Sequence, residues 1–197
     1  MPSYAWMYRL GLTPWERYGQ VAGASVAEHL DLERAAAGQP PGRALDLGCG
    51  RAQLTPELVR RGWATVGIDI VPAAIEAARR TDPDGATYVV GDVTSLAGSG
   101  LGRFDLFVDV GCFQGFDPAG RAAVGRGVTA LANPGARLLM LAFGPTRLRS
   151  MIGGVTETEV TSAFPGWRLT GSQPAETAGL GWPMNRTAPR WYRLQLA

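Results

Sequence analysis

Four aspartates stand where short apolar runs of the sequence end, and together they suggest one binding site. They are Asp46, Asp69, Asp92 and Asp109. In a doubly wound sheet, ligands bind beyond the carboxyl ends of the strands, so acids at successive strand ends meet along one edge. Carboxylates gathered there favour a ligand that carries positive charge or hydrogen-bond donors. Four such acids are more than helix capping requires.

The first acid leads into a glycine-rich turn, Asp46-Leu47-Gly48-Cys49-Gly50. Gly48 and Gly50 permit a sharp turn and let a ligand lie against main-chain atoms. The charge of Asp46 would repel a diphosphate but hold an ammonium group. Gln53 stands where the dinucleotide pattern has its third glycine. Both features disfavour a nicotinamide-dependent oxidoreductase, which we keep as a less favoured alternative.

The next two acids suit the remaining parts of a nucleoside. Asp69 follows Asp46 by 23 positions, where an acid accepts hydrogen bonds from ribose hydroxyls. Asp92 is placed to accept the exocyclic amine of adenine, with the backbone N–H of Val93 beside the ring. A ligand with a cationic amino-acid end, a ribose and an adenine satisfies all three acids, and S-adenosylmethionine has these parts.

Residues 43–145 resemble the class I methyltransferases, whose first motif is an acid followed by Gly-x-Gly. Ala52 departs from the family pattern by replacing a third glycine. The resemblance implies that S-adenosylmethionine is the cofactor and that the strand ends bind it. The implied cofactor contacts are Asp46, Gly48, Cys49, Gly50, Leu54, Asp69, Ile70, Gly91, Asp92, Val93, Asp109 and Val110.

The first 20 residues are unusually aromatic, and their Tyr-Arg-x-Gly-x-Thr-Pro-Trp run resembles the lid of the thiopurine and tellurite methyltransferase-like branch. The resemblance implies that Trp15 contacts the methionine end of the cofactor or the acceptor. Tyr8 and Tyr18 would then border the acceptor. The alternative is an aromatic anchor that only packs the terminus against the core.

The same resemblance places Phe113 and Gln114 beside the reacting sulfonium. Related sequences often have histidine where Gln114 stands, and an amide offers hydrogen bonds but no titratable base. Asp109 and Gln114 are therefore the candidate catalytic residues, and Arg147 is a candidate contact for an anionic acceptor. In-line displacement without a strong base suits an ionised thiol, a phenol or a heterocycle as the small-molecule acceptor. A non-catalytic S-adenosylmethionine-binding protein is the alternative.

Other catalytic groups have little support in the sequence. Cys49 and Cys112 have no neighbouring histidine, so a cysteine nucleophile is disfavoured. The single histidine, His29, falls within an expected helix, where we expect a surface or partly packed residue. One histidine and scattered acids form no recognisable set of metal ligands.

Positioning these residues requires alternating strands and helices. We expect strands near residues 43–50, 63–70, 86–93, 104–113 and 136–144, followed by 167–172 and 190–196. Helices are expected at 21–37, 54–61, 71–80, 117–131 and 157–164, and a loop at 95–102. This order predicts a Rossmann-like doubly wound α/β fold. Its seven-stranded, mostly parallel sheet would have helices on both faces and an antiparallel C-terminal strand.

Length and composition favour one domain spanning residues 1–197, with a lid at 1–20, a cofactor-binding core at 43–145 and acceptor-side elements at 146–197. The sequence contains arginine but no lysine, and its net charge of +2 is too small to favour nucleic acid as the partner. It has no recognisable signal sequence and no apolar run that would span a bilayer. We therefore expect a cytoplasmic protein with no membrane partner.

Overall fold

The computed structural model describes residues 23–146, 153–177, 182 and 184–197. Its centre is a seven-stranded sheet with the order β3-β2-β1-β4-β5-β7-β6. The neighbouring pairs from β3 to β5 are parallel, whereas β7 runs antiparallel to both β5 and β6. The strands are β1 (Arg43–Leu47), β2 (Ala64–Asp69), β3 (Thr87–Val90), β4 (Phe104–Val110), β5 (Ala132–Ala142), β6 (Trp167–Pro174) and β7 (Arg190–Leu196). The sequence prediction of a mostly parallel sheet with an antiparallel C-terminal strand is confirmed.

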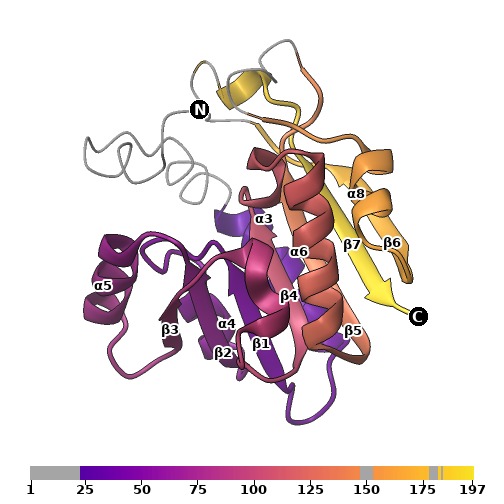
Figure 1. The fold of residues 1–197 in the computed structure, drawn as a ribbon. Coiled ribbons are helices and arrows are strands. Elements are labelled where there is room, and N and C mark those ends of the chain that lie inside the picture. The colour runs from indigo at the N-terminus through magenta and orange to yellow at the C-terminus, as the bar shows by residue number, and fades with distance from the viewer. Residues whose placement is uncertain (1–22, 147–152, 178–181, 183) are drawn as a thin grey trace.

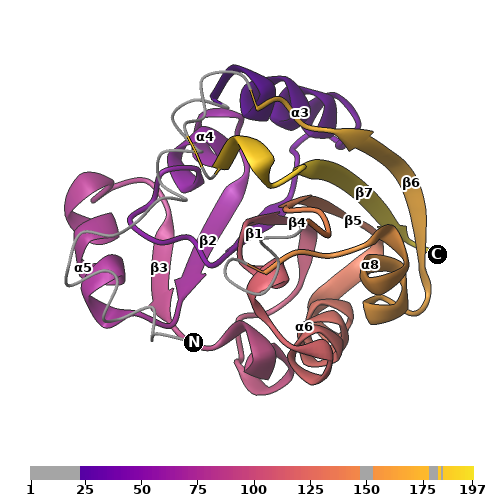
Figure 2. The same ribbon diagram turned by 90° about the horizontal axis from the view of Figure 1, so that it is seen from above.

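Helices cover both faces of this sheet, as Figure 2 shows from above, with α3 and α4 on one side and α6 and α8 on the other. Strands buried on both faces read as continuous apolar runs, which is why the central strands were recognisable in the sequence. The helices are α3 (Gly23–Ala35), α4 (Thr55–Arg60), α5 (Pro72–Thr81), α6 (Pro118–Leu131) and α8 (Glu157–Ala163), with short 3₁₀ helices η1 (Val93–Gly98), η2 (Phe113–Gly115) and η3 (Met184–Arg186).

Each face of the sheet has its own hydrophobic core. On the α6 side, Val124 and Val128 pack with Phe107 and Met140 of the strands. On the opposite side the core contains residues from α3, α4 and the alternate strand positions, including Val26, Leu30, Leu58, Val108 and Leu139. Successive strand residues point to opposite faces, so β4 and β5 contribute to both cores. The sheet is therefore packed between two layers of helices (Figure 1).

Helix boundaries follow the local sequence. The side chain of Asp117 accepts a hydrogen bond from the backbone of Gly120 and begins α6, with Pro118 in the first turn. Thr156 and Glu159 form a capping box at the start of α8. These two helices begin where the sequence predicts.

Two elements differ from the sequence prediction. Residues 93–98 form η1 rather than belonging to a loop that begins at residue 95, because Asp92 accepts the backbone N–H of Thr94 and caps this turn. The fifth strand begins at Ala132 rather than at Ala136. Asn133 within this extension donates a hydrogen bond to Asp105 of β4 at 2.7 Å, which ties it to the sheet despite the Asn-Pro-Gly sequence.

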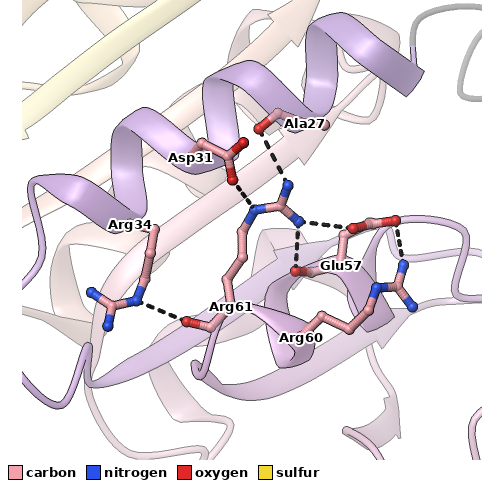
Figure 3. A network of polar contacts seen from close by, with 6 residues as sticks. All are labelled: Ala27, Asp31, Arg34, Glu57, Arg60 and Arg61. Carbon is pink, nitrogen blue, oxygen red and sulfur yellow. Dashed lines mark hydrogen bonds and ion pairs between the residues drawn. The ribbon is translucent and has the colours of Figure 1, made fainter.

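A polar network fastens α3 to the end of α4 (Figure 3). The guanidinium of Arg61, directly after α4, contacts Asp31 of α3 at 2.7 Å and Glu57 at 2.8 Å. In return, Arg34 of α3 donates to the backbone oxygen of Arg61 at 2.9 Å. This network lies on the outer side of the two helices and keeps them together.

Within the described part of the chain, no helix is both long and apolar enough to cross a membrane.

Candidate cofactor-binding and methyl-acceptor site

The turn after β1 has the backbone that a close ligand contact requires. Gly48 and Gly50 adopt positive φ angles of 71° and 55°. A Cβ atom at Gly48 would lie 2.8 Å from the side chain of Cys112, so the turn closes tightly against the segment after β4. Ala52 also has a positive φ, 64°, so the turn adopts the left-handed conformation at a residue other than glycine. The turn therefore presents main-chain atoms at the edge of the sheet.

Three of the four predicted acids lie buried at this edge, and we call them the edge carboxylates: Asp46, Asp69 and Asp109. Asp46 accepts a hydrogen bond of 2.7 Å from the hydroxyl of Thr55 at the start of α4. Asp69 accepts the backbone N–H groups of Gly50 and Val71, each at 2.9 Å. The sheet register pairs residues of β1 with both β2 and β4, which brings the three strand ends together.

Asp109 accepts only backbone donors among the described contacts. Its carboxylate receives the N–H groups of Cys112 and Phe113 at 3.0 Å, which fixes the sharp turn after β4. No described arginine forms an ion pair with Asp46, Asp69 or Asp109. The edge carboxylates thus gather three carboxyl groups in a buried region, and none of them forms an ion pair with a cationic side chain of the described residues.

Burial and mutual repulsion affect the ionisation of these acids. Burial raises the pKa of Asp46 to about 7, and the nearby Asp69 adds to the increase, while the hydrogen bond from Thr55 opposes it. Burial also raises the pKa of Asp109 to about 7 against the effect of its backbone donors. The pKa of Asp69 is raised by burial as well. A cation bound here would favour the ionised forms and reverse these shifts.

The fourth predicted acid, Asp92, has a different environment. It is half-buried and its Oδ1 accepts both the N–H and the hydroxyl of Thr94, at 2.8 and 2.7 Å. These bonds cap η1. Val93 next to it is 5% exposed, and the N–H of Gly91 donates to the backbone oxygen of Asp69. The structure therefore gives Asp92 a capping role and leaves its contact with adenine a prediction.

An exposed apolar strip lies beside the edge carboxylates. Ile70 is 58% exposed and Val90 is 46% exposed, and Val90 pairs with Asp69 in the sheet register. Two exposed apolar side chains beside one strand end offer a surface that a flat base can cover. Leu54, before α4, and Val110, at the end of β4, are half-buried and pack against the α3-side core.

Gln114 and Phe113 occupy η2, directly after β4, and differ in where they point. Gln114 is 5% exposed, and its Oε1 accepts a hydrogen bond from the backbone N–H of Phe143 at the end of β5. The ring of Phe113 is fully buried and packs against Phe164 with ring centroids 5.5 Å apart. The structure thus places Gln114 at the edge of the sheet and the Phe113 ring in the hydrophobic core.

The two cysteines show no sign of activation. The sulfur of Cys49 faces Gly67 and Tyr88, since a Cβ at Gly67 would lie 2.9 Å from it. Burial raises the pKa of both thiols, and the neighbouring acids raise it further. A thiolate nucleophile requires a lowered pKa, so these surroundings oppose one. Among the described residues, no group of three or more His, Cys, Asp or Glu is arranged to hold a metal.

Four predicted residues fall outside the described part of the chain: Trp15, Tyr8, Tyr18 and Arg147. The structure also adds two residues that sequence reasoning missed. Thr55 bonds to Asp46, and its position in the first turn of a helix after the glycine turn was the available signal. Arg121 of α6 contacts the backbone of Gln114 at 3.1 Å across seven residues, and no pattern in the sequence indicates that contact.

The chain resembles known proteins in both sequence and structure. Residues 44–135 match the family profile described as a methyltransferase domain. A 2-heptyl-1-hydroxyquinolin-4(1H)-one methyltransferase of Mycobacteroides abscessus is 30% identical over 130 residues, which are 62% of this chain and 57% of that protein. The chain spans less than two thirds of the length of the curated relatives that it matches.

Two solved structures share the fold. Magnesium protoporphyrin IX methyltransferase from Synechocystis PCC 6803 with bound SAH has a TM-score of 0.74 at 16% identity, covering 98% of this chain and 96% of that one. A TehB-like SAM-dependent methyltransferase from Corynebacterium glutamicum has a TM-score of 0.69 at 18% identity, covering 100% of both chains. At these identities the two structures show a shared fold, and the profile match over residues 44–135 is to a methyltransferase domain.

Proposed function

We propose that this chain transfers a methyl group from S-adenosylmethionine to a small-molecule acceptor, a function supported by the match of residues 44–135 to a methyltransferase-domain profile. The observation that carries the proposal is the set of edge carboxylates, buried beside a glycine turn with no described cationic side chain to balance them. Their chemistry fits a ligand that brings its own positive charge.

The residues of the site have distinct proposed roles. Asp46 and Asp109 hold the cationic end of the cofactor, with Gly48 and Gly50 admitting it close to the main chain. Asp69 accepts hydrogen bonds from the ribose hydroxyls in place of those from the backbone N–H groups of Gly50 and Val71. Ile70 and Val90 cover the adenine. When bound, S-adenosylmethionine supplies a methyl group that is activated by positive sulfur.

The protein's contribution to catalysis is alignment and exclusion of water rather than proton transfer. Asp109 and Gln114 lie at the end of β4 and bound the place where acceptor and methyl group would meet. Alignment of reacting atoms in a dry site supplies much of the rate enhancement of a displacement reaction. The substrate named for the Mycobacteroides abscessus relative, an N-hydroxyquinolone, supports a small aromatic or heteroaromatic acceptor.

Calorimetric titration with S-adenosylmethionine and S-adenosylhomocysteine tests cofactor binding. We expect both to bind at micromolar concentrations and Asp69→Ala to weaken binding about 100-fold or more, since a carboxylate that bonds two hydroxyls is lost. Asp84→Ala is the matched control, because Asp84 is exposed and remote from the strand ends. Absence of binding below millimolar concentrations, or binding of NAD or NADP instead, overturns the proposal.

Turnover separates an enzyme from a protein that only binds the cofactor. The protein is incubated with radiolabelled S-adenosylmethionine and a panel of phenols, thiols and hydroxylated heterocycles, including 2-heptyl-1-hydroxyquinolin-4(1H)-one. We expect label to enter at least one acceptor, and Asp69→Ala to abolish this incorporation. Cofactor binding without labelling of any acceptor would favour the non-catalytic alternative.

The thiopurine and tellurite branch is a finer assignment that we keep as a proposal. It is supported by the aromatic sequence between Tyr4 and Tyr18. The likeness to the TehB-like structure, at 18% identity, supports the fold alone. Labelling of a thiopurine in the same panel would support the branch.

A further inference from the structure

The amide of Gln114 has an orientation that its contacts determine. A backbone N–H can only donate, so the atom of Gln114 that faces the N–H of Phe143 is its carbonyl oxygen, Oε1. The NH₂ group therefore points the other way. It carries two donors and no lone pair, so the free end of this side chain acts as a donor and not as a base.

This NH₂ group lies at the edge where the acceptor would bind. Its nitrogen is 3.8 Å from the position that a Cβ would take at Gly111, the residue directly after β4. Gly111 has a φ of 85° and donates its N–H to Leu141 of β5, so the turn is fixed between the two strands. Asp109 lies two residues earlier, among the edge carboxylates.

A second set of contacts holds the backbone of Gln114. Arg121, which is 7% exposed, donates to the backbone oxygens of Gln114 at 3.1 Å and Gly154 at 3.3 Å. Its guanidinium also pairs with Glu159 of α8 at 3.0 Å. A Cβ at Gly153 would lie 2.5 Å from the oxygen of Gln114, so the two segments pack closely. Arg121 is thus a positioning residue that keeps the Gln114 amide in place.

We propose that Gln114 selects acceptors that react as oxyanions, namely acidic phenols and hydroxylated heteroaromatic compounds, by donating a hydrogen bond to the ionised oxygen. The proposal rests on the proposed function of the chain. It commits to oxygen because an amide N–H forms a stronger hydrogen bond to a small oxyanion than to a large thiolate sulfur.

The positions of other titratable groups support this role. The single histidine of the chain, His29, is buried beside Trp191 in the α3-side core, with ring centroids 4.3 Å apart. The edge carboxylates already accept hydrogen bonds from Thr55 and from backbone donors. These described groups are engaged elsewhere, and a fixed donor at Gln114 favours ionisation of the acceptor by lowering the pKa of the bound hydroxyl.

The proposed step balances in charge and atoms. One lone pair of the acceptor oxyanion accepts the hydrogen bond from Nε2 of Gln114, and another forms the new oxygen–carbon bond to the methyl group. As this bond forms, the sulfur–methyl bond breaks and its electron pair remains on sulfur. The negative oxygen and the positive sulfur both become neutral, so no proton has to be removed during the step.

Two substitutions at Gln114 test the proposal. Gln114→Glu keeps an oxygen for the Phe143 N–H but turns a second oxygen toward the acceptor, whereas Gln114→Met removes both polar groups. Gln195→Glu is the matched control, because Gln195 pairs with Arg137 in the middle of β5 and donates to the backbone oxygen of Gly135, away from the carboxyl edge where Gln114 lies. The probes are 1-hydroxyquinolin-4(1H)-one, 4-nitrophenol and 4-nitrothiophenol, and S-adenosylhomocysteine is titrated into every variant.

We expect the wild-type chain to methylate at least one of the two oxygen acceptors. Gln114→Glu should raise the KM for that acceptor at least tenfold, and Gln114→Met should lower kcat/KM by a similar factor. In the pH profile of kcat/KM, Gln114→Met should also move the apparent pKa of the acceptor upward, toward its value in solution. Affinity for S-adenosylhomocysteine should stay within about twofold, and Gln195→Glu should match the wild type.

The outcomes distinguish failure of the proposed function from failure of the proposed role of Gln114. Failure of the wild-type chain to bind the cofactor, or to methylate any acceptor of the panel, overturns the proposed function and this inference with it. Methylation of 4-nitrothiophenol but of neither oxygen acceptor overturns the inference alone. So does methylation of an oxygen acceptor with the same kinetics and pH profile in both Gln114 variants.

Discussion

Two of the groups of buried acids in the described part of the chain differ in whether they have partners of opposite charge. Beneath α3, Glu33 pairs with Arg137 at 2.9 Å and with Arg193 at 3.1 Å, and Arg193 also donates to Nδ1 of His29 at 2.8 Å. We call these four residues the α3 cluster. The edge carboxylates have no such described cationic partners. Ion pairs fasten a helix to the sheet, whereas acids without a cationic partner mark a place where a ligand supplies the opposite charge.

His29 of the α3 cluster and the edge carboxylates respond to pH in opposite directions, whereas burial raises the pKa of Glu33 as it does those of the edge carboxylates. Burial and the nearby Arg193 lower the pKa of His29, so its contribution to stability is lost as the pH falls below the ordinary histidine value of about 6.5. The folded state raises the pKa of Asp46 and Asp109 to about 7. It therefore binds more protons than the unfolded chain between pH 4 and 7, and stability contributed by these acids falls as the pH rises through that range.

Removing the acid of the α3 cluster should have the largest effect on stability. Glu33→Ala leaves two guanidinium groups without their carboxylate. We expect a loss of about 2 to 4 kcal/mol in the free energy of unfolding, below the full cost for completely buried ions because both arginines are partly exposed. Urea unfolding at pH 7.5 measures this loss. Glu28→Ala, on the exposed side of α3, should change it by less than about 0.5 kcal/mol. Equal losses in the two variants would show that the ion pairs of the α3 cluster do not stabilise the fold.

Cofactor binding should depend on pH because the edge carboxylates must be ionised to hold a cation. With the pKa of Asp46 and Asp109 raised to about 7, binding at pH 6 requires release of a proton. The affinity for S-adenosylmethionine should therefore be about tenfold weaker at pH 6 than at pH 8, for one coupled proton. Calorimetry in buffers of different ionisation enthalpy measures the released proton directly. Equal affinity at the two pH values, with no proton released, would argue against these acids as the cation site.

Removing an acid from the edge should stabilise the chain without cofactor, the reverse of the Glu33 result. Asp46→Asn keeps an oxygen for the Thr55 hydroxyl and removes a buried charge. We expect a gain on the order of 1 kcal/mol in the free energy of unfolding at pH 8 and a smaller gain at pH 5, because only part of the pH-dependent loss caused by Asp46 has developed there. Binding of S-adenosylmethionine should be lost in the same variant. A loss of stability at pH 8 would place Asp46 among the structural residues.

The fold and the edge carboxylates could be predicted because both depend on local patterns. Apolar runs that end in aspartate identify buried parallel strands, and parallel strands bring their carboxyl ends to one edge. Asp92 shows the limit of this rule, since the same pattern placed it at a strand end where it caps η1. An acid after a strand can serve a ligand or a turn, and the sequence alone does not distinguish the two.

The remaining features depend on contacts between distant residues. His29 and Arg193 are 164 positions apart, and only the antiparallel placement of β7 brings Arg193 beneath α3. The orientation of Gln114 depends on the N–H of Phe143, which is 29 positions away. Phe113 has an aromatic side chain that suits either an acceptor pocket or a core, and the packing of α8 decides in favour of the core. Such choices are made by tertiary structure, which periodicity does not encode.

The polar network between α3 and α4 contrasts with the α3 cluster because it contacts the same helix from its outer side (Figure 3). We expect it to make the smallest contribution to stability. Its acids are solvated: the side chains of Asp31 and Glu57 are 67% and 36% exposed. Exposed ion pairs contribute little because water and salt screen them. We expect Asp31→Ala to lower the free energy of unfolding by no more than about 0.5 kcal/mol, and less in 0.5 M salt, a concentration at which screening extends over only a few ångströms. A loss comparable with that of Glu33→Ala would mean that the exposed ion pairs hold α3 as strongly as the ion pairs of the α3 cluster do.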